Sequence, residues 1–271
     1  MNKFSLFLLL LSTAFGTAQN AETYFENIRN NEAQLTAFFS QMPKGGDLHH
    51  HYSGSVYAEP LIAYAIKNNF YLNLETLEVQ PQRGTDGIWE SFEMIQKNGA
   101  LPLYQQKIIE KWSIKDFNGI SYPSDKQFFE SFGKFEATIK GTFEQGLLEL
   151  KNRAIKEQVS YIETQLSTIP CDMNTEDLTP YNEELRSLVA KKDEKAVFKA
   201  LDQLFATFNK REAAKYAANF NTNFVAKMHN DLKIDDAQFT MRYQNFVLRF
   251  MEPVDLFKNL VIAFISADNS P

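Results

Sequence analysis

The sequence predicts an α/β protein in which parallel strands alternate with helices. Helical segments of ten residues or more alternate with short extended segments, which is the order found in βα units around a parallel sheet. Glycine and proline are sparse, with 11 and 9 in 271 residues, and this favours helices over an all-β sandwich. After removal of a signal segment, the chain is long enough for one barrel or two smaller domains.

The N-terminus has the pattern of an export signal. Lys3 supplies a positive charge, and the apolar run from Phe4 to about Phe15 is too short to span a bilayer. Gly16 and Ala18 are small residues where a signal peptidase prefers them, so we expect cleavage after about Ala18. The mature protein is therefore expected to be exported, to the periplasm or out of the cell, and to have no membrane partner after cleavage.

Composition excludes several other classes. The formal net charge is -6 and there is no block of Lys or Arg, so nucleic acid is not an expected partner. No glycine-rich phosphate loop is present. Cys171 is the single cysteine, which excludes an intrachain disulfide. We interpret it as a small loop residue, because no histidine motif nearby supports a catalytic thiol.

The elements follow from apolar periodicity and from the residues that interrupt it. Pro43 and the Gly45–Gly46 pair end a first helix, and Gly141 is expected to divide a long helical stretch. Residues 71–123 are mixed and give no clear pattern. Helices are predicted at 21–41, 57–70, 128–158, most of 182–233, and from 253, and strands at 47–54, 159–167 and 243–252.

Three of the four histidines stand in one row, His49, His50 and His51. Strand side chains alternate between two faces, so His49 and His51 should share a face and His50 should point away. Active sites of (β/α)8 barrels lie at the carboxyl ends of the strands, and two imidazoles spaced in this way suit one divalent metal ion. Asp47 is expected deeper on the same face, as a group behind the ligands or in packing.

The row has plainer interpretations as well. A histidine tract in an exported protein is also typical of a solvated loop or a chance metal-scavenging segment. Two ligands do not make a zinc site, because zinc takes at least three. From the residues alone, both interpretations stay open.

The residues around the row carry a resemblance to a known family. The stretch MPKGGDLHHHYSGS, residues 42–55, resembles the first-strand motif of the adenosine deaminase family, in particular its exported, growth-factor-related branch. Residues 128–140 and the strand at 159–167 look like the helix that gates the nucleoside pocket and the family's Tyr-x-Glu strand. Residues 245–253 are similar to the next barrel strand. The matching positions of the first motif are Pro43, Lys44, Leu48, His49, His51 and Gly54.

The resemblance implies a (β/α)8 TIM-type barrel hydrolase with one zinc ion (Zn2+) per active site. The chain would hold about the first four strands of that barrel and an N-terminal helical extension. The implied reaction is hydrolytic deamination of adenosine or 2'-deoxyadenosine to inosine and ammonia. Zinc would lower the pKa of a water so that it attacks C6 of the purine at neutral pH. A purine nucleoside is the expected small-molecule partner, and a homodimer is left open.

Residue roles follow from the same resemblance. His49 and His51 would be metal ligands, and His51 and Ser53 would also contact the substrate. Ser53 stands where intracellular members have an Asp that hydrogen-bonds the ribose, and a serine is a weaker, neutral partner there. Gln165 stands where an Arg is common, which puts local packing in doubt more than chemistry.

Three phenylalanines match the gate positions of the family's lid helix. Phe128, Phe129 and Phe132 would cover the purine and exclude bulk water. Their spacing is also that of an ordinary buried helix face, and this alternative stays open.

The later family motifs are absent from this chain. His229 is the only histidine after His51, and its charged helix predicts a surface position. A His-Ala-Gly-Glu stretch, a water-orienting His and an Asp-Asp pair are not found, so no catalytic residue is expected within the chain. The resemblance places these groups beyond Pro271, the last residue of the sequence.

We therefore expect an N-terminal fragment that is inactive alone. The expected segments are a signal peptide at 1–18, a helical extension at 19–41 and part of a deaminase barrel at 42–271. If the gene continues past Pro271, the next residues should carry the remaining metal ligands and the catalytic acid.

Other functions remain compatible with the sequence. One is another amidohydrolase-type barrel enzyme, such as a dipeptidase or a different aminopurine deaminase. A second is a non-catalytic exported relative that binds nucleosides or a surface partner. The third is a helical exported protein with a fortuitous histidine tract.

Overall fold

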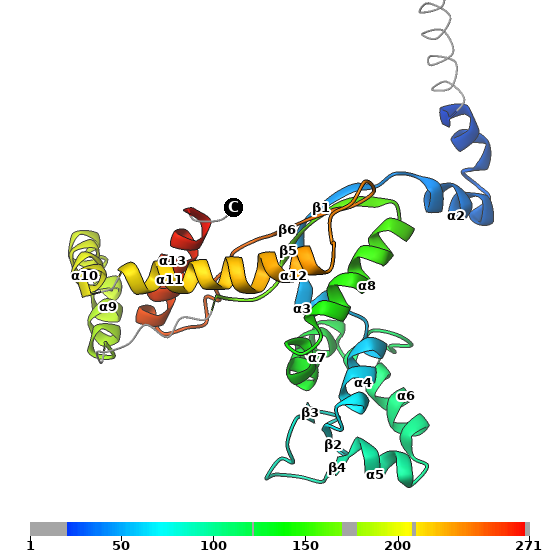
Figure 1. The fold of residues 1–271 in the computed structure, drawn as a ribbon, viewed down its shortest axis with the longest axis horizontal. Helices are drawn as coiled ribbons and strands as arrows, with labels where there is room; N and C mark the ends of the chain where they lie inside the picture. The colour runs from blue at the N-terminus through cyan, green and yellow to red at the C-terminus, as the bar shows by residue number, and fades with distance from the viewer. Residues whose placement is uncertain (1–20, 121, 170–177, 208–209, 269–271) are drawn as a thin grey trace, which may run out of the picture.

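The computed structural model describes residues 21–120, 122–169, 178–207 and 210–268. They form a mixed α/β fold with a three-stranded parallel sheet in the order β1-β5-β6 and a small antiparallel sheet in the order β3-β2-β4 (Figure 1). The predicted α/β class with a parallel sheet is therefore confirmed at this level.

Three of the sequence predictions fall on other parts of the chain. The predicted signal peptide and Cys171 lie outside the described residues. Pro271, beyond which the catalytic groups are expected, also lies outside them. The expectation that catalytic groups follow Pro271 therefore stays a prediction.

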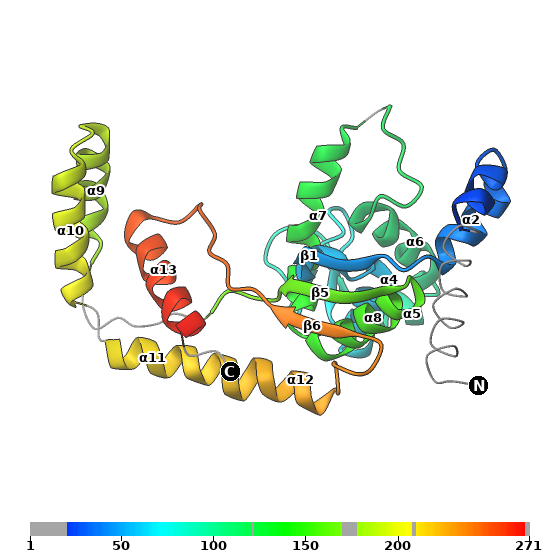
Figure 2. The same cartoon turned by 90° about the horizontal axis from the view of Figure 1, so that it is seen from above.

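The parallel sheet has helices packed against one of its faces. Figure 2 shows α4 and α8 behind the three strands, with the opposite face open. Ile162 and Met241 point into the core on the helix side, whereas Glu163 and Arg242 alternate onto the open face. The strands are β1 (Gly45–His51), β5 (Val159–Gln165) and β6 (Thr240–Tyr243).

The third strand lies earlier than the sequence predicts. The predicted strand at 243–252 is wrong, because β6 ends at Tyr243 and the next residues are irregular. The apolar run there finds no partner strand, and Phe250 is 97% exposed. The short segment that does pair with β5 carries Met241, which is fully buried.

The predicted N-terminal helix is in fact two helices. Residues 21–28 are helical, and α2 (Glu32–Gln41) begins a second helix. Asn31 between them has an extended backbone, and its Oδ1 accepts a hydrogen bond from the Gln34 N–H at 3.1 Å. This N-cap satisfies a free donor of the new helix and so favours a fresh start at that point.

The helices that cover the sheet agree with the predicted pattern. The long stretch divides near Gly141 as expected, where an added Cβ would overlap the Tyr64 hydroxyl. Tyr52 is fully buried, and its hydroxyl donates to the Thr142 carbonyl oxygen at 2.9 Å. This hydrogen bond connects the end of β1 to the start of the helix at Phe143–Lys156. These helices are α4 (Ala58–Lys67), α7 (Ser124–Ile139) and α8 (Phe143–Lys156).

A compact insertion separates β1 from α7. Its strands have only two or three residues, too short for alternation to reveal them in the sequence. Trp89, Phe92 and Ile108 are buried there. The elements are α3 (Tyr52–Ser55), β2 (Tyr71–Asn73), β3 (Val79–Gln80), β4 (Trp89–Ser91), α5 (Phe92–Lys97) and α6 (Leu101–Trp112).

The described residues from Pro180 to Asp231 are mostly helical, which confirms the helices predicted for most of 182–233. Figure 2 shows α11 and α12 in line as one long rod, with a π-helical turn between them. The elements are α9 (Pro180–Ala190), α10 (Glu194–Thr207), α11 (Lys210–Asn219), η1 (Phe220–Ala226), α12 (Lys227–Asp231) and α13 (Pro253–Asp268). None of the described helices is both long enough and apolar enough to cross a membrane.

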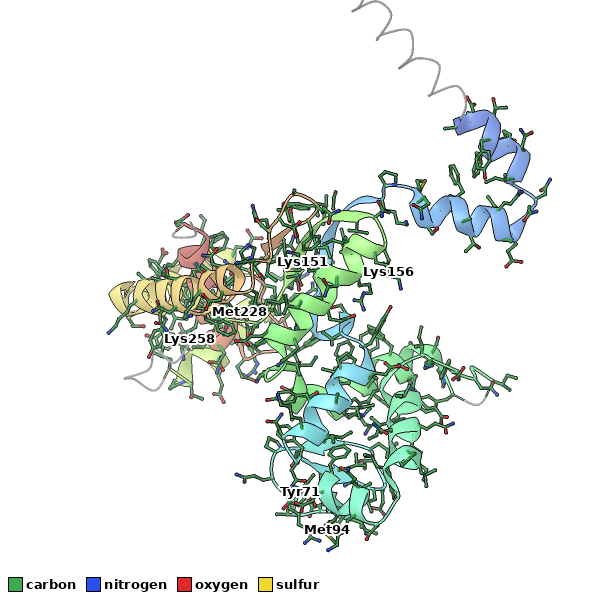
Figure 3. All side chains as sticks on the ribbon, turned by 45° about the vertical axis from the view of Figure 1, so that its right-hand side comes forward. Tyr71, Met94, Lys151, Lys156, Met228 and Lys258 are labelled. Atoms are coloured by element: carbon green, nitrogen blue, oxygen red, sulfur yellow. The ribbon has the colours of Figure 1, made fainter. Side chains whose placement is uncertain are left out.

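A lysine ties α8 to the turn that leads into β6. Lys151 lies on α8 (Figure 3). It donates to the Lys233 carbonyl oxygen at 2.7 Å and pairs with Asp236 at 2.6 Å. Two contacts from one side chain hold this turn against the helix layer. They help to place β6 beside β5, although the two strands are far apart in the sequence.

Candidate metal-binding site on the open face of the sheet

The register of the strands decides which histidines face together. His51 is opposite Gln165, and His50 is opposite Thr164. Residues opposite each other in a parallel pair share a face, so His51 lies on the open face with Gln165. His50 lies on the helix side, where its Nδ1 is 2.9 Å from the Thr164 hydroxyl.

His49 and His51 meet on the open face. Their Nε2 atoms are 3.0 Å apart, and the ring centroids are 4.9 Å apart. Two nitrogens bound to one tetrahedral zinc ion at the usual bond length would be about 3.3 Å apart. The pair therefore has nearly the separation that one metal ion requires, and both rings are accessible because both residues are exposed.

His50 is held as a structural histidine. It is half-buried, and burial lowers the pKa of its imidazole below the ordinary value, with Asp47 acting in the opposite direction. A neutral ring can exchange one hydrogen bond with the Thr164 hydroxyl. The middle member of the row is thus directed away from the pair, as strand alternation predicts.

The prediction that Asp47 lies behind His49 and His51 on their shared face is wrong. Asp47 is exposed, and its Oδ1 accepts a hydrogen bond from the His49 N–H at 3.1 Å. The register of β1 against β5 is irregular between Asp47 and His50, so simple alternation does not extend back to Asp47. The carboxylate therefore contacts the backbone of the histidine segment.

A hydrogen-bonded bridge crosses the open face beside the pair. Gln244 Nε2 donates to the Leu48 carbonyl oxygen at 3.0 Å and to Glu163 Oε2 at 2.8 Å. The Tyr161 hydroxyl donates to Glu163 Oε1 at 3.0 Å. Side chains following β6 and within β5 thus reach the strand that carries the histidines. The sequence analysis missed Gln244, because nothing local links it to Leu48.

Two of the three predicted gate phenylalanines line a common cavity, and the third does not. Phe128 and Phe132 pack with ring centroids 5.1 Å apart and line a cavity of about 550 Å³, together with Gly54 and Trp112. Phe129 is 72% exposed and lies outside the cavity lining. The buried stripe of α7 runs instead through Gln127, Ser131 and Phe135. Phe128 is thus not part of an ordinary buried helix face.

The other predicted substrate residues lie apart from this cavity. Ser53 is half-buried in the single turn of α3, and neither Ser53 nor His51 lines the cavity. Gly54, the next residue, does reach it, and a Cβ there would come within 3.3 Å of the Phe132 ring. The end of β1 and α7 are therefore neighbours, but the cavity walls are mainly apolar.

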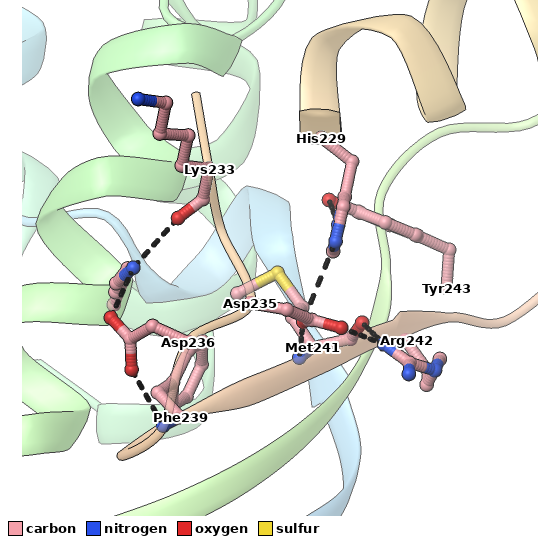
Figure 4. A network of polar contacts seen from close by, with 9 residues as sticks. His229, Lys233, Asp235, Asp236, Phe239, Met241, Arg242 and Tyr243 are labelled. Carbon is pink, nitrogen blue, oxygen red and sulfur yellow. Dashed lines mark hydrogen bonds and ion pairs between the residues drawn. The ribbon is translucent and has the colours of Figure 1, made fainter. Parts of the chain in front are cut away.

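His229 is not a surface residue, which corrects the sequence prediction. Its side chain is only 16% exposed, with Nε2 3.4 Å from Asp235 Oδ1 and Nδ1 3.2 Å from the Tyr243 hydroxyl (Figure 4). Val225, His229 and Leu232 share one helical stripe, and the two apolar members pack on the core. That spacing is the signal that could have placed His229 inside.

The network around His229 shifts the titration of its members. Burial lowers the pKa of the His229 imidazole, and Asp235 opposes this shift. Burial raises the pKa of the Asp235 carboxyl, but hydrogen bonds from Arg242 and the Met241 N–H outweigh burial, and the pKa is lowered overall. Burial raises the pKa of Tyr243. These shifts favour a neutral histidine beside a charged aspartate.

Comparisons with known proteins identify no family for this chain. The chain matches no protein-family model, and no curated protein is similar to it. Within the described ranges, no group of three or more His, Cys, Asp or Glu side chains could hold a metal ion. The His49–His51 pair fits a metal as two donors, and the described residues do not supply the remaining ligands.

Proposed function

We propose that His49 and His51 bind one zinc ion and that the chain belongs to a zinc-dependent deaminase acting on adenosine or 2'-deoxyadenosine. The observation that carries this proposal is the 3.0 Å separation of the two Nε2 atoms. Bound zinc would supply Lewis-acid activation of water near neutral pH. The resemblance of residues 42–55 to the first-strand motif of the adenosine deaminases supports the choice of reaction.

The chain's own residues would hold the metal and shelter the substrate. His49 and His51 would each donate a neutral imidazole nitrogen. Phe128 and Phe132 would offer a flat ring an apolar wall and exclude water from it. A volume of about 550 Å³ is within the range of pockets for small organic ligands. The other zinc ligands and the groups that move protons are not found among the described residues.

We also propose that the parallel sheet is part of a (β/α)8 barrel. Parallel sheets almost always have both faces covered, whereas helices here cover one face and the other carries His51, Glu163 and Arg242. Polar residues gathered near the carboxyl ends of strands are typical of the inward face of such a barrel. Export after cleavage near Ala18 is proposed from the N-terminal pattern alone.

Binding of a nucleoside without turnover is the second candidate function. It is favoured by the absence of a third metal ligand among the described residues. A cavity with aromatic walls needs no metal to retain a purine ring.

The decisive assay is conversion of adenosine to inosine by the complete protein, loaded with zinc and then treated with a chelator. The proposal expects zinc-dependent turnover that falls to background in His49→Ala and persists in His50→Gln. Dipeptides tested in parallel should not be hydrolysed. Turnover that survives both chelation and His49→Ala would contradict a zinc enzyme. Saturable adenosine binding with no inosine would favour the second candidate.

A further inference from the structure

The strand that carries the histidine pair is irregular at the pair itself. Asp47 is opposite Ile162 and His50 is opposite Thr164, so β1 advances by three residues while β5 advances by two. Leu48 and His49 therefore have no register partner on β5. An extra residue of this kind breaks the alternation of a strand and re-aims a side chain, and such bulges are frequent beside active sites.

Side chains satisfy the backbone groups of this irregular segment. The His49 N–H donates to Asp47 Oδ1 at 3.1 Å, and the Leu48 carbonyl oxygen accepts from Gln244 Nε2 at 3.0 Å. Backbone groups that have lost ladder partners need substitutes. These two contacts therefore favour the observed backbone path over a regular one.

Gln244 is itself held at three points. Its backbone N–H donates to the Thr164 carbonyl oxygen at 2.9 Å. Its side-chain amide donates to Glu163 at 2.8 Å as well as to Leu48. Glu163 in turn accepts the Tyr161 hydroxyl at 3.0 Å. The amide therefore reaches Leu48 from a fixed support that spans β5 and the end of β6.

The bulge includes one of the two histidines whose rings approach each other. In a regular strand, residues two apart are separated by about 6.7 Å along the strand. The two rings here are inclined at 63° to each other, and their Nε2 atoms are 3.0 Å apart. His49 lies inside the irregular segment and His51 outside it, so the backbone path at Leu48 and His49 sets the aim of one ring toward the other.

We propose that Asp47 and Gln244 are positioning residues that hold the bulge in β1 and thereby aim His49 at His51. The inference rests on the proposed zinc function only in naming the ligand that the aimed pair receives. Asp47 acts through the His49 N–H and Gln244 through the Leu48 carbonyl, and neither needs to contact the metal. Glu163 supports Gln244.

The test compares zinc affinity in matched variants of the complete protein. Asp47→Ala removes the acceptor, whereas Asp47→Asn keeps Oδ1 and removes only the charge. Gln244→Met keeps the length and removes the donor. Loss of a group that orients a ligand costs roughly 10–100-fold in metal affinity. We expect that loss in Asp47→Ala and Gln244→Met, with Asp47→Asn close to wild type. Equal weakening in Asp47→Ala and Asp47→Asn would indicate a charge effect and overturn the proposal, as would no weakening in either Asp47→Ala or Gln244→Met.

A metal-free measurement separates this inference from the zinc function. Cross-relaxation between the ring protons of His49 and His51 by NMR reports their proximity without zinc. The contact should be present in wild type and Asp47→Asn, and lost in Asp47→Ala and Gln244→Met. A complete wild-type protein that shows this pattern but binds no zinc would refute the proposed function and leave the positioning role standing. A contact that persists in all variants would refute the positioning role.

Discussion

At the scale of single residues, His50 and His229 contact neighbouring protein groups and have structural roles. His50 is bonded to the Thr164 hydroxyl, and His229 lies between Asp235 and the Tyr243 hydroxyl. Burial lowers the pKa of both imidazoles. His50 links β1 to β5 within the sheet, and His229 links α12 to β6. The exposed pair, His49 and His51, whose rings contact each other, is thus distinguished by its environment and not only by its position in the row.

The titration of His229 predicts how stability depends on pH. Unfolded, His229 takes up a proton near pH 6.5, its ordinary value, whereas the folded chain holds it neutral to a lower pH. Below pH 6.5 the unfolded state therefore binds more protons than the folded state. The free energy of unfolding should fall as pH decreases from 6.5 toward the folded pKa. Urea unfolding between pH 7 and pH 5 should show this loss of stability. In His229→Gln, the free energy of unfolding should depend less steeply on pH. An unchanged slope in His229→Gln would contradict the assigned environment.

The sequence predicted which histidines of the row share a face, but not how closely His49 and His51 approach each other. Strand alternation is local, so it correctly separated His50 from its two neighbours. The approach of His49 to His51 depends on a bulge held by Gln244, which is 196 residues from Leu48. No local periodicity encodes that contact. The partly buried position of His229 was encoded in a stripe shared with Val225 and Leu232, but the charged composition of the helix obscured it.

At the scale of elements, the joint between β1 and α8 depends on a close approach. The Tyr52 hydroxyl lies directly against Gly146 within α8, where an added Cβ would overlap it. The end of α6 and the start of α7 are joined by the buried Gln127. Its Nε2 lies within 3.1 Å of three carbonyl oxygens at the end of α6. These contacts hold the helix layer behind the strand that carries the histidines.

Two glycine-to-alanine changes should act in opposite directions. Gly146→Ala puts a methyl group into the buried Tyr52 contact and should lower the free energy of unfolding by about 1–3 kcal/mol. Gly133→Ala lies in α7 with nothing within 4 Å of the new Cβ, and should raise it by up to about 1 kcal/mol through helix propensity. Chemical denaturation of both variants measures the difference. Equal effects would contradict the packing described at Tyr52.

Elements with strong local signals were predictable, and those defined by distant partners were not. β5 and the division near Gly141 agree with the sequence. The strand predicted at 47–54 is confirmed only as far as His51, because residues 52–55 form the single turn of α3. β6 was misplaced because the most apolar run nearby is not the segment that pairs with β5. The insertion's short strands and the helix break at Asn31 were missed, because two or three residues, or one cap, give little periodicity.

At the scale of the whole molecule, a parallel sheet brings together residues from three distant parts of the chain on one open face. β1 contributes the histidine pair, β5 contributes Glu163, and Gln244 follows β6. Helices cover the other face (Figure 2). The cavity lined by Phe128 and Phe132 is also lined by Gly54, which closely follows the carboxyl end of β1. Ligand sites in α/β folds lie at this end of the strands, which agrees with the proposed position of the metal and substrate.

The central claim is that the two outer histidines of the row, and not the middle one, receive one metal ion. Calorimetric titration of zinc into the metal-free complete protein tests it most directly. We predict one zinc per chain in the wild type and in His50→Gln, and no saturable binding in His49→Ala or His51→Ala. Binding that is abolished by His50→Gln, or that survives the loss of either outer histidine unchanged, would contradict the claim.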